Sequence, residues 1–117
     1  MITREFRTEH RGSTITAILH ITGADCTVLV TGGQKEHVGA VSLCGGDGAV
    51  QTLTLSGHKE QFITEPWCRR IHAITGGNVS VTAGIHYDKL TKEEIEQVMT
   101  VVDGLLDEIL SWMKIVG

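Results

Sequence analysis

The sequence predicts a single α+β domain with two layers, a two-layer sandwich in which a five-stranded, mostly antiparallel or mixed sheet carries two helices on one face. Three observations support this prediction. The chain has 117 residues, the usual size of one domain. Its first half contains four short segments with a period of two, and its second half contains two helical patterns separated by a fifth strand-like segment. No linker or repeat interrupts this pattern, so residues 1–117 are assigned to one domain.

Four strands are predicted ahead of the first helix, because β-branched residues recur there in alternation. In the first of these strands, Ile15, Ala17, Leu19 and Ile21 share one side. Turns rich in Gly and Asp, at residues 23–25 and 45–48, join the strands into two hairpins. The predicted strands are Ser13–Ile21, Cys26–Thr31, Val38–Leu43 and Val50–Leu55.

The first helix is predicted within Lys59–Thr75, where Trp67, Ile71 and Ile74 have helical spacing. Pro66 limits its start, since a proline inside a helix costs about 3 kcal/mol. Either the helix starts near residue 65, with the proline in its first turn, or a separate short turn at residues 59–63 precedes it. A fifth strand, Val79–Ile85, follows this helix and can pair in parallel with a neighbour.

The second helix is predicted to start at Thr91, which forms a capping box with Glu94. Leu90 and Ile95 flank the cap as a hydrophobic staple. The helix should run for about 22 residues, or ~33 Å, and its apolar end should pack on another subunit of a homo-oligomer. Its apolar stripe comprises Val98, Met99, Val102, Leu105, Leu106, Ile109, Leu110 and Met113.

Composition excludes several classes of function. The formal net charge is −4 and the basic residues are scattered, which argues against nucleic acid as a partner. The three cysteines, Cys26, Cys44 and Cys68, have no disulfide or zinc spacing and are expected to be small core residues. The sequence has no signal-peptide pattern and no apolar run long enough for a membrane span, so a cytoplasmic protein is expected.

Three of the six histidines occupy comparable places at the ends of predicted strands. His37 precedes the third strand, His58 follows the fourth and His86 follows the fifth, each with a glycine nearby. Loops at strand ends commonly carry binding residues, so these histidines are expected to share one polar pocket. Neutral imidazoles could bind a divalent metal there, completed by Glu36 or Asp88. Alternatively, the three histidines are loop residues that hydrogen-bond to the backbone.

Two glycine-containing loops could receive a phosphate. The first contains Gly32 and Gly33 after a strand, although it is not a P-loop. The second contains Gly57 and Lys59 between a strand and a helix, where backbone N–H groups and a cation could face an anion. No nucleophile elbow or Ser-His-Asp order is present, so no catalytic residue is assigned.

Three segments resemble a known family. GGQKEHVGAV, LSGHKE and VTAGIHYDKLTKEEIEQV occur in the order and spacing of the LpdD-like prenylated-flavin chaperones, over roughly residues 14–100. The resemblance implies a protein that binds prenylated FMN and assists its maturation or delivery to a UbiD-type aromatic acid (de)carboxylase, with a flavin prenyltransferase as a further partner. It carries over His37, Gly39, His58, Lys59, His86 and Asp88 as cofactor-binding residues.

Two other functions stay open at this point. The chain could be a small metal-dependent enzyme, in which His37, His58 and His86 hold the metal and Glu36 or Glu60 acts as a base. It could also be a regulatory or structural subunit without a ligand, whose histidines are merely hydrogen-bonded polar groups.

Overall fold

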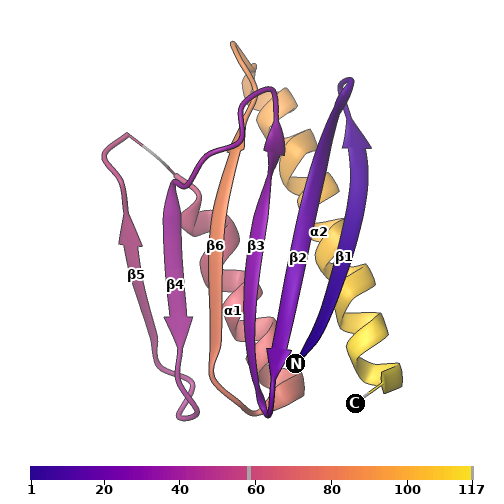
Figure 1. The fold of residues 1–117 in the computed structure, drawn as a ribbon. Helices are drawn as coiled ribbons and strands as arrows, with labels where there is room; N and C mark the ends of the chain where they lie inside the picture. The colour runs from indigo at the N-terminus through magenta and orange to yellow at the C-terminus, as the bar shows by residue number, and fades with distance from the viewer. Residues whose placement is uncertain (58, 117) are drawn as a thin grey trace.

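The computed structural model describes residues 1–57 and 59–116, and within them it contains six strands and two helices (Figure 1). The α+β single-domain prediction is confirmed, with one strand more than expected. The elements are β1 (Ile2–His10), β2 (Ser13–Thr22), β3 (Asp25–Gly33), β4 (Ala40–Cys44), β5 (Val50–Thr54), α1 (Gln61–Thr75), β6 (Val79–His86) and α2 (Lys92–Val116).

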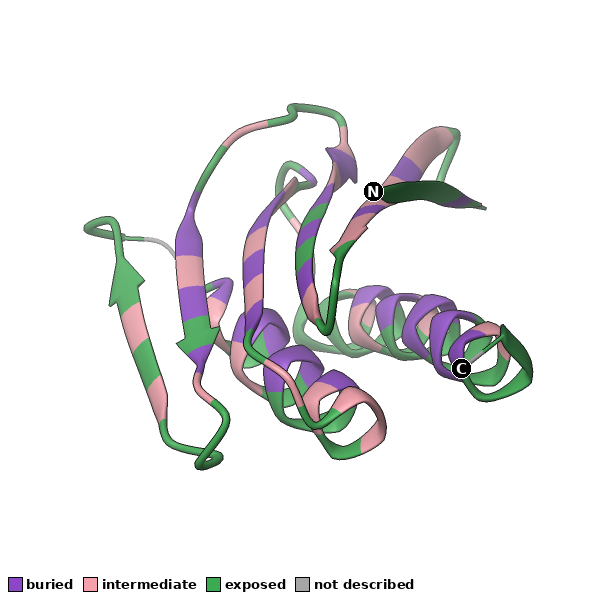
Figure 2. Cartoon of the chain, turned by 60° about the horizontal axis from the view of Figure 1, so that its bottom comes forward, coloured by how far each residue is buried: buried purple, intermediate pink, exposed green. Residues whose placement is uncertain are grey.

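All six strands form one mixed sheet in the order β1-β2-β3-β6-β4-β5. β3 and β6 are parallel neighbours, whereas the other neighbouring pairs are antiparallel. Both helices lie on the same face of the sheet (Figure 1), and their buried sides face the strands (Figure 2). The core is therefore a single apolar layer between helices and sheet, and the opposite face of the sheet is open.

Strand β1 is the element that the sequence pattern did not predict. Its sequence, ITREFRTEH, alternates poorly because only Phe6 is buried and charged residues occupy both sides. Arg4 lies on the helix side, yet its guanidinium stacks 4.7 Å from the Phe6 ring centroid and 5.0 Å from that of Trp112. An arginine whose guanidinium covers aromatic rings can occupy a position on the helix side of a strand, where alternation would lead one to expect an apolar residue.

Helix α1 passes through Pro66, so both predicted ways of placing that proline were wrong. The helix begins at Gln61 and continues to Thr75, where Gly76 in the left-handed conformation ends it. A proline leaves the carbonyl four residues earlier, that of Phe62, without its helical partner. Because Phe62 and Pro66 are both exposed, water can bond that carbonyl.

Helix α2 has 25 residues, and its predicted capping box is confirmed. The Glu94 backbone N–H donates to Thr91 Oγ1 at 3.2 Å, and the Thr91 N–H donates to Glu94 Oε1 at 2.9 Å. The end of the helix was expected to expose apolar side chains to another subunit. Ile109, Leu110 and Met113 are instead buried within the chain, because the unpredicted strand β1 extends the sheet beneath α2. Ile115 and Val116, at the very end of the helix, are 84% and 59% exposed.

The three cysteines are free and buried, as expected for small core residues. Burial raises the pKa of the Cys26 thiol to about 11 and that of the Cys68 thiol to about 12. Within the described residues, no helix is long and apolar enough to cross a membrane.

Candidate functional site

The site is built where the parallel strands β3 and β6 end side by side, with Gly33 in register with His86. The backbone N–H of Gln34 donates to the His86 carbonyl at 2.7 Å, and the backbone N–H of Asp88 donates to the Gln34 side chain at 2.7 Å. A β-carbon on Gly33 would overlap with the His86 carbonyl. These contacts hold the loops after both strands against one another.

The segment from residue 34 to residue 39 crosses the end of β6 to reach β4 (Figure 1). It passes so close that a β-carbon on Gly84 would overlap with the His37 carbonyl group. A β-carbon on Gly39 would likewise overlap with the Glu60 carboxylate. Glycine at positions 84 and 39 thus lets the crossing segment lie directly on β6 and lets Glu60 approach it. The strand predicted to begin at Val38 begins at Ala40, because residues 38 and 39 belong to this crossing.

Two of the three predicted histidines come together at this edge. The ring centroids of His37 and His86 are 6.4 Å apart, in an edge-to-face arrangement. His37 Nε2 lies 2.8 Å from Glu60 Oε1, and its Nδ1 lies 3.2 Å from the Lys35 carbonyl oxygen. His86 Nε2 lies 2.7 Å from Asp88 Oδ1. The third predicted member, His58, lies outside the described residues.

Each histidine of the pair therefore faces a carboxylate, and the two differ in their access to solvent. The His37 and Glu60 side chains are only 17% and 10% exposed, whereas those of His86 and Asp88 are 46% and 70% exposed. The buried pair holds the crossing segment to the start of α1. The exposed pair is accessible to a ligand at the surface.

Two hollows border His86. The smaller, of about 320 Å³, is lined by Lys35, His37, Val38 and His86. The larger, of about 470 Å³, lies between the start of α1, the end of β6 and the start of α2, with Lys59, Glu60 and His86 as its charged or polar side chains. Its apolar walls are Phe62, Ile63, Ile85, Leu90, Ile95, Val98 and Met99, joined by Tyr87 and Gly57.

Of the glycines and the lysine that were predicted to bind the cofactor, some border the larger hollow and others are packed inside the fold. Gly57 has a φ of 80° and open space where a β-carbon would stand, and it borders the larger hollow with the exposed Lys59. Gly32 is buried, and a β-carbon there would overlap with the backbone of Thr14 and Ile15. Gly32 thus serves the packing of β3 on β2, while Gly33 supports His86.

Of the three histidines predicted to hold a metal, the described residues bring together His37 and His86. In residues 1–57 and 59–116, no group of three or more His, Cys, Asp or Glu side chains has an arrangement that could hold a metal ion. His37 and His86 are close to one another, and Asp88 is paired with His86. Glu36, which was expected to complete the site, is an exposed residue of the crossing segment.

Sequence reasoning missed the apolar walls of the larger hollow. Phe62 is 63% exposed at the start of α1, and Ile95 is 52% exposed at the start of α2. Both are large apolar residues on exposed helix faces, which is the signal that could have pointed to them. Glu60 was considered only as a base, whereas the structure pairs it with His37.

Comparisons with known proteins agree with the resemblance seen in the sequence. The family model described as the prenylated flavin chaperone LpdD-like domain matches residues 9–114. Protein LpdD of Lactiplantibacillus plantarum (strain ATCC BAA-793 / NCIMB 8826 / WCFS1) is 33% identical over 114 residues, which cover 93% of this chain and 84% of that protein. A chain from a chaperone complex for yeast 20S proteasome assembly has the same fold, with a TM-score of 0.63, 12% identity, and coverage of 96% of this chain and 97% of that one.

Proposed function

This chain belongs to the family of prenylated flavin chaperone LpdD-like proteins, and from that premise we propose that it binds prenylated FMN beside His86. In this proposal the protein accepts the cofactor from a flavin prenyltransferase and assists its maturation or its delivery to a UbiD-type decarboxylase. The observation that carries the proposal is the apolar hollow of about 470 Å³ that opens next to the histidine pair.

The chemistry of the larger hollow supports a flavin as the ligand. Its volume falls within the range of about 300–1,000 Å³ that is typical of ligand pockets. Aliphatic and aromatic walls suit a planar ring system with an isoprenoid-derived part. Lys59 and His86 also line the hollow and could offer a cation and an imidazole to polar groups of the ligand.

The phosphate of the cofactor is a dianion and requires donors. Lys59 is our candidate at the larger hollow, which Gly57 also lines, and Lys35 is a candidate at the smaller one. His37 is held by Glu60 and the Lys35 carbonyl, so we assign it to the support of the crossing segment. We assign His86, which is more exposed, to the ligand itself.

A divalent metal held by His37, His58 and His86 is the alternative to this assignment of His37, since a metal would have to displace one of the present partners of that ring. In it, the metal would add positive charge beside the phosphate. A chelator should then release cofactor from the loaded protein, and metal analysis should find about one ion per chain. If the chelator leaves cofactor retention unchanged, no metal takes part in binding, and Lys59 and Lys35 are the cations that face the phosphate.

The proposal also places the protein in the cytoplasm, where thiols stay reduced. Three free, buried cysteines support this location. Both proposed partner enzymes would have to share that compartment.

Transfer to the decarboxylase tests the proposed role. The protein is purified after co-expression with a flavin prenyltransferase and then mixed with cofactor-free decarboxylase. We expect decarboxylase activity to rise with the amount of loaded protein, and to stay near background with the His86→Ala variant. The matched control is His20→Ala, since His20 lies on β2 and bonds to Thr3. A loaded wild-type protein that activates nothing would overturn the delivery role.

A further inference from the structure

The open face of the sheet is almost free of formal charge. Strands β2, β3, β4, β5 and β6 together contain one residue of the Asp, Glu, Lys and Arg types, namely Asp25 at the first position of β3. Its carboxylate accepts a bond of 2.9 Å from the Asn78 backbone N–H. The edge strand β1 contrasts with them, because it carries Arg4, Glu5, Arg7 and Glu9.

Most residues on this face are aliphatic or carry hydroxyl groups, and His20, Gln51 and His86 are further polar side chains on the same side of their strands. Alternation in the strands buries one set of side chains under the helices and turns the other set to the open side. Leu29, Leu43 and Leu53 of the open set are 37%, 53% and 76% exposed. One pair of hydroxyls on this side is bonded within the face, because Ser80 Oγ donates to Thr27 Oγ1 at 3.2 Å. This pair can lose water without being left unpaired.

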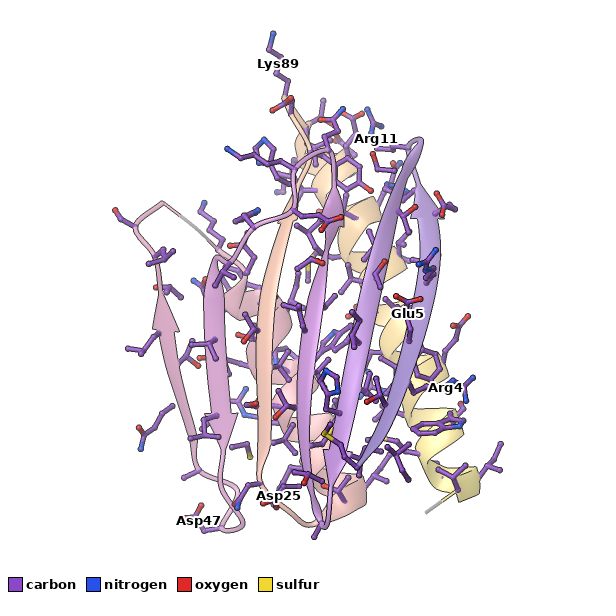
Figure 3. All side chains as sticks on the ribbon, viewed as in Figure 1. Arg4, Glu5, Arg11, Asp25, Asp47 and Lys89 are labelled. Atoms are coloured by element: carbon purple, nitrogen blue, oxygen red, sulfur yellow. The ribbon has the colours of Figure 1, made fainter. Side chains whose placement is uncertain are left out.

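Charged residues surround this face. Figure 3, viewed onto the open side, labels Glu5 on the edge strand, Arg11 at the β1–β2 turn and Lys89 beyond β6. It labels Asp25 and Asp47 at the turns on the opposite end of the sheet. An uncharged centre within a charged rim is the composition of a protein–protein interface, in which charged residues are depleted from the core.

We propose that a second copy of this chain packs on the open face, sheet against sheet, to form a two-fold symmetric dimer. A two-fold interface brings the same patch against itself, and like charges that meet there are unfavourable. With a net charge of −4 for the chain, the uncharged face is the surface best suited to face its own copy. Two sheets pack in this way about 10 Å apart.

The size of the face suits a dimer. The five strands β2 to β6, which contain Asp25 as their single charged residue, have between 5 and 10 residues each. With strands about 4.8 Å apart and residues about 3.3 Å apart along them, the face covers roughly 600 Å² per copy. The two copies together would bury roughly 1,200 Å² or more, which reaches the lower bound of stable interfaces.

The dimer would place the candidate site at the border of the interface. His86 belongs to the same side of β6 as Ser80 and Thr82, and the His37 carbonyl lies over Gly84 on that side. The second copy would thus meet the crossing segment and stand beside the exposed His86 ring. The dimer does not depend on flavin binding, so either proposal can fail while the other stands.

Sedimentation of the full chain tests the dimer. We expect the wild type at micromolar concentration to have twice the chain mass of 12.7 kDa. Leu43→Glu and Leu29→Glu each put a charge on the face, and each should raise the dissociation constant at least about a hundredfold. The matched control is Ile115→Glu on α2, since Ile115 is 84% exposed away from the sheet, and it should stay dimeric.

Circular dichroism of every variant shows whether the fold is kept, and a face variant that unfolds is replaced in the test by the other one. A wild type that sediments as a 12.7 kDa monomer would overturn the proposal. So would a dimer that Ile115→Glu dissociates and the face variants do not. A monomeric wild type whose binding to the decarboxylase is blocked by Leu43→Glu would assign the face to the enzyme and also overturn the second copy.

Discussion

At the scale of single residues, the site depends on glycines, which have no side chain, as much as on the histidines. Gly84 and Gly39 leave room for the His37 backbone and the Glu60 carboxylate. His37 and His86 could be found from the sequence, because each stands at a strand end beside a glycine. Their closeness could not, because it depends on the contact between Gly84 and a segment 47 residues earlier.

Replacement of Gly84 by alanine tests this close contact. The new β-carbon would overlap with the His37 carbonyl, so the crossing segment must shift. We expect a loss of about 1–3 kcal/mol in the free energy of unfolding, together with weaker cofactor retention. Gly104→Ala is the matched control, since a β-carbon there would meet open space, and it should stabilise helix α2 by up to about 1 kcal/mol. Urea unfolding of both variants measures the difference, and equal stabilities would contradict the packing argument.

The cysteines allow a second test at this scale. Burial raises the pKa of Cys26 to about 11 and that of Cys68 to about 12, and the thiolate is the reactive form. We expect the thiols of the folded protein to react negligibly at about pH 8 with a disulfide reagent that releases a coloured product. After unfolding in denaturant, all three thiols of the chain should react. Rapid reaction of the native protein would show that the core opens readily.

At the scale of elements, the start of α2 is the clearest link from sequence to structure. The pattern Thr-x-x-Glu predicted the cap, and both of its bonds form. The two failures have physical causes. Strand β1 lacks apolar alternation because Arg4 covers the aromatic rings of Phe6 and Trp112. Helix α1 tolerates Pro66 because packing of Trp67, Ile71 and their buried neighbours outweighs the lost backbone bond.

Thr91→Ala tests the contribution of the cap. Loss of the hydroxyl leaves the Glu94 backbone N–H without its acceptor, which should cost about 1 kcal/mol of stability. Thr91→Ser keeps the hydroxyl and should restore most of the loss. Denaturant midpoints of the three proteins give the comparison, and an alanine variant as stable as the wild type would remove the cap from the account.

The same cap predicts a dependence of stability on acid pH. Bonding to Thr91, first through its backbone N–H, lowers the pKa of Glu94 from its ordinary 4.5, and the nearby Arg11 acts in the same direction. A lowered folded-state pKa contributes stability above the unfolded-state pKa, and this contribution is lost as pH falls through the folded-state value. The wild type should therefore lose stability below about pH 4.5.

Glu94→Gln isolates this effect, because an amide oxygen can still accept the Thr91 N–H bond but does not titrate. Thermal unfolding between about pH 6 and pH 3 should show a smaller loss for the variant than for the wild type. Parallel curves for the two proteins would assign the acid sensitivity to other carboxylates.

At the scale of the whole molecule, the two faces of the sheet differ in what packs on them. The helices cover one face and supply the core, whereas the uncharged face is open to a second copy (Figures 1 and 2). The candidate site lies at the end of β6, where both layers meet. This arrangement could not be predicted from the sequence, because it depends on the order of the strands, which inserts β6 between β3 and β4.

Several residues of the candidate site were already proposed from the sequence. These residues either line one of the two hollows at the end of β6 or make the contacts that support it. They are His37, Gly39, Lys59, His86 and Asp88. The apolar walls, such as Ile63, Leu90 and Met99, were missed because these residues also fit a helix core or a staple. Only the tertiary structure shows that these residues line the same hollow.

Native mass spectrometry of the protein after co-expression with a flavin prenyltransferase can detect the cofactor bound to each variant. We expect prenylated FMN on the wild type and on His20→Ala, and little or none on His86→Ala at equal thermal stability. Wild-type protein without the cofactor, or an His86→Ala variant that retains it fully, would contradict the claim that this edge of the sheet is the flavin site.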